Sequence, residues 1–389
     1  MKPDLTLIFP KSDFLINQTV FLPLGILYIS SHFKRNDKKV QCLDFGIGHT
    51  VDMVEAEIVG VSITTPQRED AFNIVKELKQ LDKYTIAGGP HATHMEKECY
   101  SAGYDLVIKG EAEYEFFDAP SNVDDIGFPD RDALPIKKYK YYINNIPATT
   151  LITSRGCPFN CSFCARISKS CKIQSPERTV REIIDIYLKY GFKAFMIFDD
   201  VFTISKKRVR KITELLDKED FIFRCFSRAN MLDKEMCELL KELNVKEVGI
   251  GIESGSQKVL DKNMKGTTIE NNTIAVKNLQ DVDIRAKVFL IVGLPGEDEQ
   301  SIVDTERWIL ETKPNDIDIS IFQPLPGSDI FGNPKKYGIK FNYNSKNQWY
   351  KGTPGKYISN VRTEKLTEDD IVFHRDRLES LYKNRKLLR

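Results

Sequence analysis

The sequence has no long apolar run and no excess of either charge. No stretch of about 18 consecutive apolar residues occurs, which predicts that the chain has no transmembrane helix. The first residues, "MKPDLTLIFPKSDF", lack a basic region followed by a long apolar one, so we expect no secretory signal. Lys and Arg number 57 and Asp and Glu number 56, and the resulting charge of +1 gives no overall attraction to nucleic acid or membranes. These absences favour a cytoplasmic protein with no clear nucleic-acid signal.

The eight cysteines are too few and too unevenly spaced for a disulfide scaffold in 389 residues, and they favour metal or redox use. Three of them stand in "CPFNCSFC" with the spacing C-x3-C-x2-C: Cys157, Cys161 and Cys164. A structural zinc site takes four ligands, and no other Cys or His stands at ligand spacing, with Cys171 the nearest candidate. Three thiolates suit a [4Fe–4S] cluster in which one iron is left open for a substrate or cofactor. Most of the scattered cysteines are expected to be small buried side chains: Cys42, Cys99, Cys171, Cys225 and Cys237.

The length predicts two domains, and the first, 1–118, alternates short apolar strands with helices. Such an alternation is typical of a doubly wound, Rossmann-like parallel sheet that is covered on both faces. Ligands of these sheets bind beyond the carboxyl ends of the strands, so the loops after Pro10, Asp44, Ser62 and Ala87 are of interest. Strands are expected at 4–10, 40–46, 57–64, 84–91 and 105–111, and helices at 24–37 and 68–81. A segment rich in Pro, Asp and Gly, 119–147, indicates a linker.

A second alternation, 148–330, contains six strand–helix units. That number is too small for an eightfold barrel and fits a partial (βα)6 barrel of the TIM type, in which the chemistry lies at the carboxyl ends of the strands. The three clustered cysteines directly follow its first strand. The expected strands are 148–154, 194–200, 221–229, 247–254, 285–294 and 316–325, and the helices are 177–190, 205–217, 233–243, 269–280 and 299–311. The remainder, 331–389, is expected to be a small C-terminal extension with a helix that begins after Thr367.

The cysteine segment resembles the cluster-binding loop of the radical S-adenosylmethionine (SAM) superfamily, with Phe163 as the aromatic residue of that loop, and the resemblance extends over the partial barrel. It implies that Cys157, Cys161 and Cys164 hold a [4Fe–4S] cluster and that SAM chelates the open iron. In that family one electron from the reduced cluster cleaves SAM to methionine and a 5′-deoxyadenosyl radical, which abstracts hydrogen from the substrate. A reductant such as flavodoxin or ferredoxin is therefore an expected partner.

The same resemblance implies SAM-binding residues at the ends of later strands. Asp199, with Asp200 as the second choice, matches the position that binds the methionine amino group; a helix N-cap is the alternative reading. Arg228 is expected to face the SAM carboxylate or the substrate. In "GIESGS", Glu253 matches the residue that accepts hydrogen bonds from the ribose hydroxyls, with Ser254 beside it. In "FLIVGLPGE", Gly293 permits a close approach on the adenine side.

The first domain resembles the cobalamin-binding domain that precedes the barrel in one radical SAM branch, on the segments "CLDFG", "VGVSITTPQ" and "IAGGPHAT". This resemblance implies cobalamin contacts at five positions: Asp44, Ser62, Thr64, Gly88 and Gly89. Two departures leave a degenerate domain without corrinoid as the alternative. Gly46 stands where the motif D-x-H-x-x-G supplies a cobalt-ligating histidine, and the segment between 113 and 124 is too short for a helix common in the family. His91 is expected to have a role in its loop and not to bind cobalt.

The predicted function is cobalamin-dependent radical SAM methyl transfer to an unactivated carbon or phosphorus of a small molecule or peptide. Radical rearrangement or ring contraction, radical SAM chemistry without cobalamin, and a nonenzymatic iron–sulfur or corrinoid-binding protein remain as alternatives. A methylthiotransferase is disfavoured because its leading domain would carry three more clustered cysteines. The substrate is expected at the barrel mouth, where several aromatic residues line a pocket or, as we favour, form the core of the C-terminal extension: Tyr337, Phe341, Tyr343, Trp349 and Tyr350.

Overall fold

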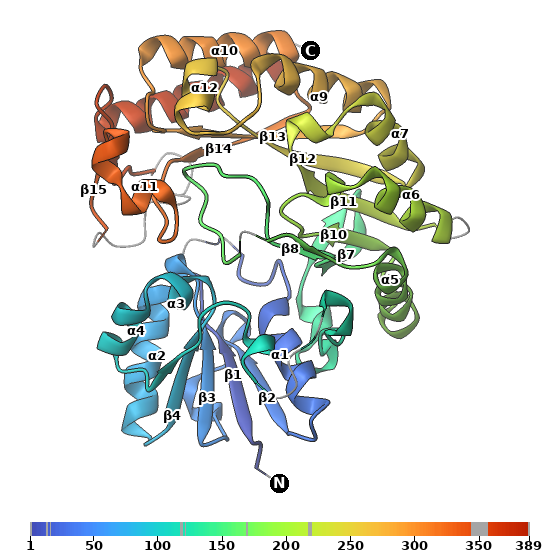
Figure 1. Cartoon of the computed structure of the whole chain (residues 1–389), viewed down its shortest axis with the longest axis vertical. Coiled ribbons are helices and arrows are strands. Elements are labelled where there is room, and N and C mark those ends of the chain that lie inside the picture. The colour runs from blue at the N-terminus through green and yellow to red at the C-terminus, as the bar shows by residue number, and fades with distance from the viewer. Residues whose placement is uncertain are drawn as a thin grey trace. The chain divides into compact units, whose positions relative to one another are not determined.

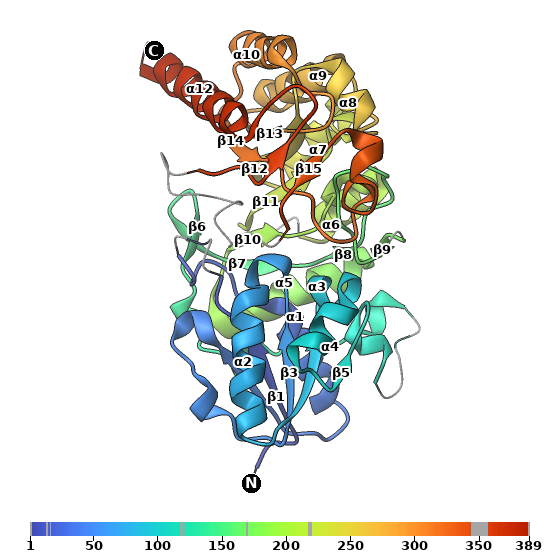
Figure 2. The same ribbon diagram turned by 90° about the vertical axis from the view of Figure 1, so that its left-hand side faces the viewer.

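The chain folds into two compact units in a computed structural model (Figures 1 and 2). The first unit comprises Met1–Tyr141, Arg166–Ser168 and Lys172–Gln174, and the second comprises Tyr142–Ala165, Lys169–Cys171 and Ser175–Arg389. The structure describes residues 2–12, 15, 17–116, 120, 122–168, 170–216, 220–343 and 357–387. Among these residues, no helix is long and apolar enough to cross a membrane.

Unit 1 contains a parallel sheet whose described strands lie in the order β2-β1-β3-β4-β5. Figure 1 shows β4, β3, β1 and β2 side by side. Because this order reverses between β1 and β3, a ligand site is expected at the carboxyl ends of these two strands. The strands are β1 Leu5–Phe9, β2 Val40–Asp44, β3 Ile58–Ser62, β4 Tyr84–Gly88 and β5 Leu106–Val107. The helices are α1 Leu24–Lys34, α2 Arg68–Gln80, α3 Pro90–His94 and α4 Glu96–Ala102.

The expected strand 84–91 ends early, at Gly88. Gly89 has a φ of +94°, which carries the chain out of the strand, and Pro90 then occupies the first position of α3. The segment after β5 contains short 3-10 helices. They are η4 Ala112–Tyr114, η5 Val123–Asp125, η6 Arg131–Ala133 and η7 Ile136–Lys138, following η1 Phe45–Ile47, η2 Val51–Met53 and η3 Thr65–Gln67 in the strand-end loops. Part of the short stretch between 113 and 124, namely 117–119 and 121, lies outside the described residues.

The segment 122–141 belongs to unit 1 and is fixed to the rest of that unit by two carboxylates, Asp130 and Asp44. The Asp130 carboxylate accepts a hydrogen bond from Ser30 at 2.6 Å and pairs with the Lys34 ammonium at 2.7 Å. Further along, the Tyr139 hydroxyl donates to the Asp44 carboxylate at 2.6 Å. Both contacts reach back to residues in the first part of the sheet domain.

Unit 2 contains a larger sheet, with its described strands in the order β14-β13-β12-β11-β10-β7-β6, and all neighbours from β7 to β14 are parallel. Asn144 and Asn145 both have positive φ, as a two-residue hairpin turn requires, and they join β6 to β7. The strands are β6 Tyr141–Ile143, β7 Ile146–Leu151, β10 Ala194–Ile197, β11 Ile222–Ser227, β12 Val245–Glu253, β13 Arg285–Val292 and β14 Asp316–Ile321, and two short strands, β8 Ser154–Arg155 and β9 Lys172–Ile173, flank the cysteine loop. This arrangement confirms the predicted fold class, a Rossmann-like sheet followed by a partial barrel.

Helices connect successive strands and follow the outer side of the curved sheet in Figure 1. They are α5 Pro176–Tyr190, α6 Lys206–Leu215, α7 Lys234–Glu242, α8 Gln257–Lys262, α9 Ile269–Asp281 and α10 Glu299–Thr312, with η8 Phe202–Ile204 and η9 Ala229–Met231 in the loops. A side chain caps the start of most of them, which satisfies a free N–H group of the first turn. The caps are Ser175 for α5, Ser205 for α6, Asp233 for α7, Thr268 for α9 and Asp298 for α10.

The outward-facing side chains of the strands form the main core with these helices. Phe195 on β10 and Phe223 on β11 stack with ring centroids 5.7 Å apart, and Val248 and Val288 continue the same layer on β12 and β13. Since side chains alternate along a strand, the neighbours Phe226, Gly249 and Phe289 lie on the inner face of the sheet. The inner face of the barrel is therefore separate from its hydrophobic core.

The C-terminal extension contains α11 Asp329–Gly332, η10 Pro334–Tyr337, the antiparallel pair β15 Lys340–Phe341 and β16 Val361–Arg362, and α12 Glu368–Leu387. Tyr337 is buried in an apolar cluster with Ile330, Ile339 and Val361, and Phe341 packs against that cluster. These two aromatic residues thus belong to the core of the extension. Tyr343 contacts the Phe331 ring, whereas Trp349 and Tyr350 lie outside the described residues.

Candidate functional site

The three clustered cysteines lie on one loop that follows β7 in unit 2. Gly156, with a φ of +83°, begins the loop, and the Cys164 N–H donates to the Cys161 carbonyl at 3.2 Å. Cys157 and Cys161 are half-buried and Cys164 is exposed. No three His, Cys, Asp or Glu side chains of the described residues converge closely enough to hold a single metal ion. In an iron–sulfur cluster each thiolate binds a different iron, so three spaced thiols on one loop fit such a group.

Ser162 fixes this loop to the segment after α8. Its N–H and its hydroxyl donate to the Asn263 carbonyl at 3.0 and 3.1 Å, and its own carbonyl accepts from the Ile330 N–H at 3.1 Å. Asn263 is held in turn, because its side-chain amide donates to the carbonyls of Val259 and Pro295 at 2.8 and 2.9 Å. The sequence interpretation missed both residues. Their side chains meet across 101 positions of the chain, and no local pattern indicates such a contact.

Phe163, the aromatic residue of the loop, packs against the apolar cluster around Ile330 and Tyr337. It holds the second half of the loop against the C-terminal extension. Phe163 therefore anchors the cysteine loop.

Arg228 lies against the cysteine loop, directly after β11. It is buried, and its Nη1 donates to the Cys161 sulfur at 3.2 Å. Its Nε donates to the Asn230 side chain at 3.1 Å, and its guanidinium lies 4.0 Å from the centre of the Phe159 ring. The structure thus places this cation on a cysteine thiol, whereas the sequence interpretation assigned it to the SAM carboxylate or the substrate.

Glu253 forms a buried ion pair at the end of β12. The Lys265 ammonium contacts its carboxylate at 2.7 Å, and both side chains are less than 10% exposed. Glu253 has a φ of +65°, and the register with β13 shifts between Gly251 and Glu253, as at a bulge that re-aims a side chain. A Cβ on Gly251 would lie 2.5 Å from the Glu253 carboxylate, so the turn requires glycine there. Lys265 was missed from sequence, since nothing in "NMKGTT" marks its partner.

The two carboxylates at the end of β10 differ in exposure. Asp199 is 1% exposed, and its two oxygens accept from the Thr153 N–H and the Thr153 hydroxyl, both at 2.6 Å. Asp200 is exposed. Neither caps α6, whose cap is Ser205. Asp199 therefore ties the start of the cysteine loop to β10, and Asp200 is the carboxylate that a ligand at this strand end can reach.

We expect Asp199→Asn to lower stability and Asp200→Asn to leave it unchanged. An asparagine at 199 has one acceptor oxygen in place of two and carries no charge, so its NH₂ group would face one of the two Thr153 groups; losing a hydrogen bond to a charged group costs about 1.5–3 kcal/mol. The thermal midpoints of the two variants and of the wild-type protein, measured anaerobically, check this difference. An equal midpoint for all three proteins would contradict it.

Gly293 lies directly after β13 with a φ of +98°. Its N–H donates to the buried Glu297 carboxyl at 2.5 Å. Burial raises the pKa of Glu297 to about 8, although hydrogen bonds from the N–H groups of Gly293 and Leu294 act in the opposite direction. Ser254 is also buried, and its hydroxyl accepts from the Ser256 N–H at 3.2 Å. Glu297 stands at the end of "FLIVGLPGE" but received no role from the sequence.

This pKa predicts that part of the stability falls as pH rises. Glu297 holds its proton in the folded chain up to about pH 8 and loses it near its ordinary value of 4.5 when unfolded. Between these values the folded state binds more protons, so the free energy of unfolding falls by up to about 1.4 kcal/mol per pH unit. Glu297→Gln keeps the acceptor for Gly293 and cannot ionise. From pH 6 to 8, the thermal midpoint of the wild-type protein should therefore fall relative to that variant; parallel curves would contradict this.

The functional side chains of unit 2 gather at one edge of the sheet. The cysteine loop, Asp199, Arg228, Glu253 and Gly293 follow five neighbouring strands of one parallel sheet. Each was predicted separately from its place after a strand, and the strand order β7, β10, β11, β12, β13 brings them together. This edge is the place where barrels of this type carry out chemistry.

Three phenylalanines line the inner face next to this edge. The rings of Phe198 and Phe226 are 5.9 Å apart, and those of Phe226 and Phe289 are 5.8 Å apart. Phe198 is 36% exposed. A Cβ on Gly249 would lie 2.6 Å from Phe226 and 2.8 Å from Phe289, so glycine makes room for both rings. We call this surface the aromatic wall.

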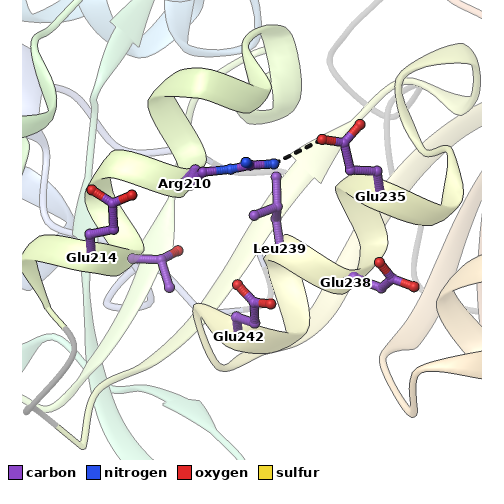
Figure 3. A pocket seen from close by; sticks show the side chains of 7 residues that line it. Arg210, Glu214, Glu235, Glu238, Leu239 and Glu242 are labelled. Atoms are coloured by element: carbon purple, nitrogen blue, oxygen red, sulfur yellow. Dashed lines mark hydrogen bonds and ion pairs between the residues drawn. The ribbon is translucent and has the colours of Figure 1, made fainter.

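An acidic pocket lies elsewhere, between α6 and α7 on the helical side of unit 2 (Figure 3). Arg210 donates to Glu235 at 2.8 Å across it, and the other lining residues are Thr213, Glu214, Glu238, Leu239 and Glu242. None of them belongs to a strand end. We therefore assign the chemistry to the strand ends and not to this pocket.

In unit 1 the predicted cobalamin positions lie at the ends of β3 and β4. Ser62 and Gly88 are register partners, and Thr64 follows in the next loop, where its hydroxyl donates to Gln67 at 2.7 Å. A Cβ on Gly88 would meet nothing within 4 Å, whereas one on Gly89 would lie 2.9 Å from the Ile63 carbonyl. Gly88 therefore borders open space, and Gly89 is required by the backbone.

Asp44, at the end of β2, is buried and serves the loop around it. Its carboxylate accepts from the Tyr139 hydroxyl and, at 2.8 Å, from the Gly46 N–H. Burial raises the pKa of Asp44, against the effect of these hydrogen bonds. A Cβ on Gly46 would lie 3.0 Å from Asp44 and 3.1 Å from Gln18. A histidine at 46, as in the motif D-x-H-x-x-G, would therefore require the Asp44 and Gln18 side chains to shift by a few tenths of an ångström.

The isolated cysteines and His91 are buried or half-buried. Cys42, Cys99, Cys225 and Cys237 are buried, as predicted, and burial raises the pKa of the Cys42, Cys99 and Cys237 thiols to about 12. Cys171 is half-buried, and burial raises its pKa as well. His91 is fully buried, with its Nδ1 3.2 Å from the Thr65 hydroxyl.

Comparison with known families defines the class of this protein. Residues 151–309 match the Radical SAM superfamily, and residues 18–118 match the B12 binding domain. The strand-end site and the cysteine loop lie in the first match, and the Gly88 edge lies in the second. The chain therefore combines a radical SAM domain with a B12-binding domain that precedes it, as its motifs predicted.

Two curated relatives and two solved structures are similar over most of the chain. An uncharacterized methyltransferase of Pyrococcus horikoshii, PH0819, is 28% identical over 89% of this chain and 85% of the relative. An anaerobic magnesium-protoporphyrin IX monomethyl ester cyclase of Rubrivivax gelatinosus is 26% identical over 72% of this chain and 59% of the relative.

The structure of the radical SAM methyltransferase TsrM from Kitasatospora setae, solved with cobalamin and [4Fe-4S] cluster bound, has a TM-score of 0.69 at 13% identity, over 87% of this chain and 77% of that one. The cobalamin-dependent enzyme OxsB has a TM-score of 0.69 at 20% identity, over 85% and 55%. These likenesses show the fold. The two family matches assign the chain a [4Fe–4S] cluster, SAM and cobalamin as cofactors.

Proposed function

We propose that this radical SAM enzyme transfers a methyl group, with cobalamin, to an unactivated carbon or phosphorus centre of a small molecule or peptide. The observation that carries the proposal is the meeting of the cysteine loop, Arg228, Glu253 and Gly293 at one sheet edge, in a chain that also has a B12-binding domain. The names of PH0819 and TsrM, both methyltransferases, support methyl transfer as the reaction.

The residues of unit 2 would hold the cluster and SAM. Cys157, Cys161 and Cys164 supply three thiolates and leave one iron for SAM. Asp200 is the carboxylate that SAM's amino group reaches, since both oxygens of Asp199 are engaged by Thr153. When bound, the cluster and SAM supply a 5′-deoxyadenosyl radical, and cobalamin supplies the methyl-carrying chemistry.

Glu253 and Gly293 would hold the nucleoside part of SAM. The Lys265 ammonium fixes one Glu253 oxygen, which leaves the other to accept from the ribose hydroxyls. The Ser254 hydroxyl would stabilise this turn, because it accepts a hydrogen bond from the Ser256 N–H. At Gly293 the Glu297 carboxyl holds the backbone in the positive-φ turn that lets the adenine approach.

In unit 1, Ser62, Thr64, Gly88 and Gly89 would hold the nucleotide tail of cobalamin at the ends of β3 and β4. Gly88 provides the space, and Ser62 and Thr64 provide hydroxyl groups next to it. Asp44 would not contact cobalamin directly but would hold the loop beside it, because its carboxylate accepts hydrogen bonds from Tyr139 and Gly46.

The aromatic wall would receive an apolar part of the substrate. Phe198, Phe226 and Phe289 present ring surface on the inner side of the barrel, next to the strand ends that hold SAM. The R. gelatinosus cyclase is named for a porphyrin substrate, which is a large planar ring system. A flat apolar substrate would suit stacking or edge contact with such rings.

The experiment is an anaerobic incubation of the cluster-loaded and cobalamin-loaded protein with SAM and a strong reductant. Methyl transfer from SAM predicts S-adenosylhomocysteine in an amount matched to the bound corrinoid, together with 5′-deoxyadenosine. The similarity to a cyclase favours radical chemistry without methyl transfer as the second candidate, and it predicts 5′-deoxyadenosine alone. Absence of both products would contradict both candidates and leave a nonenzymatic cofactor-binding protein. The natural electron donor would be a small low-potential protein such as flavodoxin or ferredoxin.

A further inference from the structure

The three cysteines differ in what surrounds them. Cys164 is exposed, whereas Cys161 is half-buried and receives a hydrogen bond from a guanidinium nitrogen of Arg228 at 3.2 Å. An arginine keeps its positive charge at every pH at which the protein is folded. A bond from such a cation to a sulfur is a charge-assisted hydrogen bond, which is stronger than one between neutral groups.

Arg228 is held in this position from several sides. The Phe159 ring, from the cysteine loop itself, lies under the guanidinium at 4.0 Å. Asn230 accepts from its Nε at 3.1 Å. On a third side, Gly266 has a φ of +65°, and a Cβ there would lie 3.2 Å from the Arg228 Nη2. The direction of the Nη1–H bond toward Cys161 is therefore fixed by the fold and does not depend on a flexible side chain.

Lys265, another cation near the loop, is paired with a carboxylate. Lys265 pairs with Glu253 at 2.7 Å, and its ammonium is 5.8 Å from the Phe163 ring. Its charge is thus directed to the strand end that we assign to SAM. Arg228 donates to the Cys161 sulfur and so places a positive charge next to that cysteine.

We propose that Arg228 is a positioning residue that raises the reduction potential of the [4Fe–4S] cluster through Cys161. Hydrogen bonds to the sulfurs and the net charge around a cluster set its potential. The reduced cluster carries one more negative charge than the oxidised one, and the adjacent guanidinium stabilises it more. The step affected is the transfer of one electron from a low-potential one-electron donor to the cluster, which must occur before SAM is cleaved. This inference rests on the cluster and does not depend on methyl transfer.

The test is a reduction potential measured without SAM and without cobalamin. The cluster would be reconstituted anaerobically in the wild-type protein and in the variants Arg228→Gln, Arg228→Met and Arg228→Lys. Each protein would then undergo a redox titration, in which the electron paramagnetic resonance signal measures the reduced cluster. We expect the reduced fraction at a given applied potential to be lower in the Gln variant, which loses the charge, and lowest in the Met variant, which also loses the donor. The Lys variant should lie nearest the wild type.

A matched control is Arg210→Gln, the same substitution at an exposed arginine of α6 that pairs with Glu235. It should leave the potential unchanged. A second readout is the initial rate of 5′-deoxyadenosine formation, which in Arg228→Gln should fall most with a weak reductant and recover with a strong one.

Three results would overturn the proposal. The first is an equal reduction potential for the wild type and the Gln and Met variants. The second is a loss of SAM affinity with no change in potential, which would mean that Arg228 binds the SAM carboxylate. Loss of the cluster in the Gln variant, with the fold retained, would assign the residue to cluster assembly. If only the Met variant lost its cluster, the reduction potentials of the Gln and Lys variants would still test the proposal. Failure of the methyltransferase proposal would appear separately, as absence of S-adenosylhomocysteine with normal potentials.

Discussion

Cys161→Ala should abolish both the iron–sulfur cluster and the cleavage of SAM. Each of the three thiolates binds one iron, and the two that remain, Cys157 and Cys164, would leave two irons without a protein ligand. The variant, reconstituted anaerobically, should contain little iron and sulfide and should form no 5′-deoxyadenosine above the protein-free background. Unit 1 should remain folded, because its sheet and its core lie in a separate part of the chain.

Cys171→Ala provides the matched control for this prediction. Cys171 is the cysteine nearest in sequence to the loop, and the zinc interpretation would need it as a fourth ligand. Since we assign the fourth position to SAM, this variant should retain about four irons per chain and form 5′-deoxyadenosine at close to the wild-type rate. Persistent product in Cys161→Ala, or loss of the cluster in Cys171→Ala, would refute the assignment of the loop.

Gly88→Leu should abolish cobalamin binding without unfolding the protein. A Cβ at this position meets nothing within 4 Å, so the leucine side chain extends into the open space at the end of β4 and not into the core. There it would occupy the place that we assign to the nucleotide tail. After incubation with hydroxocobalamin and desalting, the variant should show no corrinoid absorbance, whereas the wild-type protein should retain it.

Gly88→Leu should affect the chemistry that needs cobalamin and leave the cleavage of SAM at the cluster intact. The cysteine loop lies in unit 2, so Gly88→Leu should still form 5′-deoxyadenosine from SAM while S-adenosylhomocysteine disappears. The control is Glu77→Leu, which adds the same side chain at an exposed position of α2 and should leave corrinoid binding intact. Normal corrinoid retention in Gly88→Leu would place the cobalamin tail elsewhere in unit 1.

The positions that could be predicted from the sequence are those with a local signal. Cys157, Cys161, Cys164 and Phe163 form one short segment whose spacing is informative by itself. Glu253 and Gly293 were identified because "GIESGS" and "FLIVGLPGE" resemble SAM-binding motifs of the radical SAM superfamily and stand at strand ends, where such barrels carry out chemistry. Gly88 and Gly89 were identified from the resemblance of "IAGGPHAT" to the cobalamin-binding domain.

The partners of these residues could not be predicted, because the contacts cross long stretches of the chain. Arg228 and Cys161 are 67 positions apart, and Thr153 and Asp199 are 46 apart. Which of the two carboxylates, Asp199 or Asp200, is exposed depends on which of them meets Thr153. Two adjacent carboxylates have the same local signal, and only the packing of β7 beside β10 distinguishes them.

The sequence by itself determined the class of this protein: two α/β domains, three thiols on one loop, and the cofactors that these motifs imply. These features depend on periodicity and spacing, which are properties of neighbouring residues. Only the tertiary structure decided which side chain faces which. It placed Arg228 next to Cys161, buried Asp199 against Thr153, and set Asp44 and Gln18 close to position 46. The physical reason is that hydrogen bonds and close contacts depend on distance in space, and the strand order of the two sheets sets that distance.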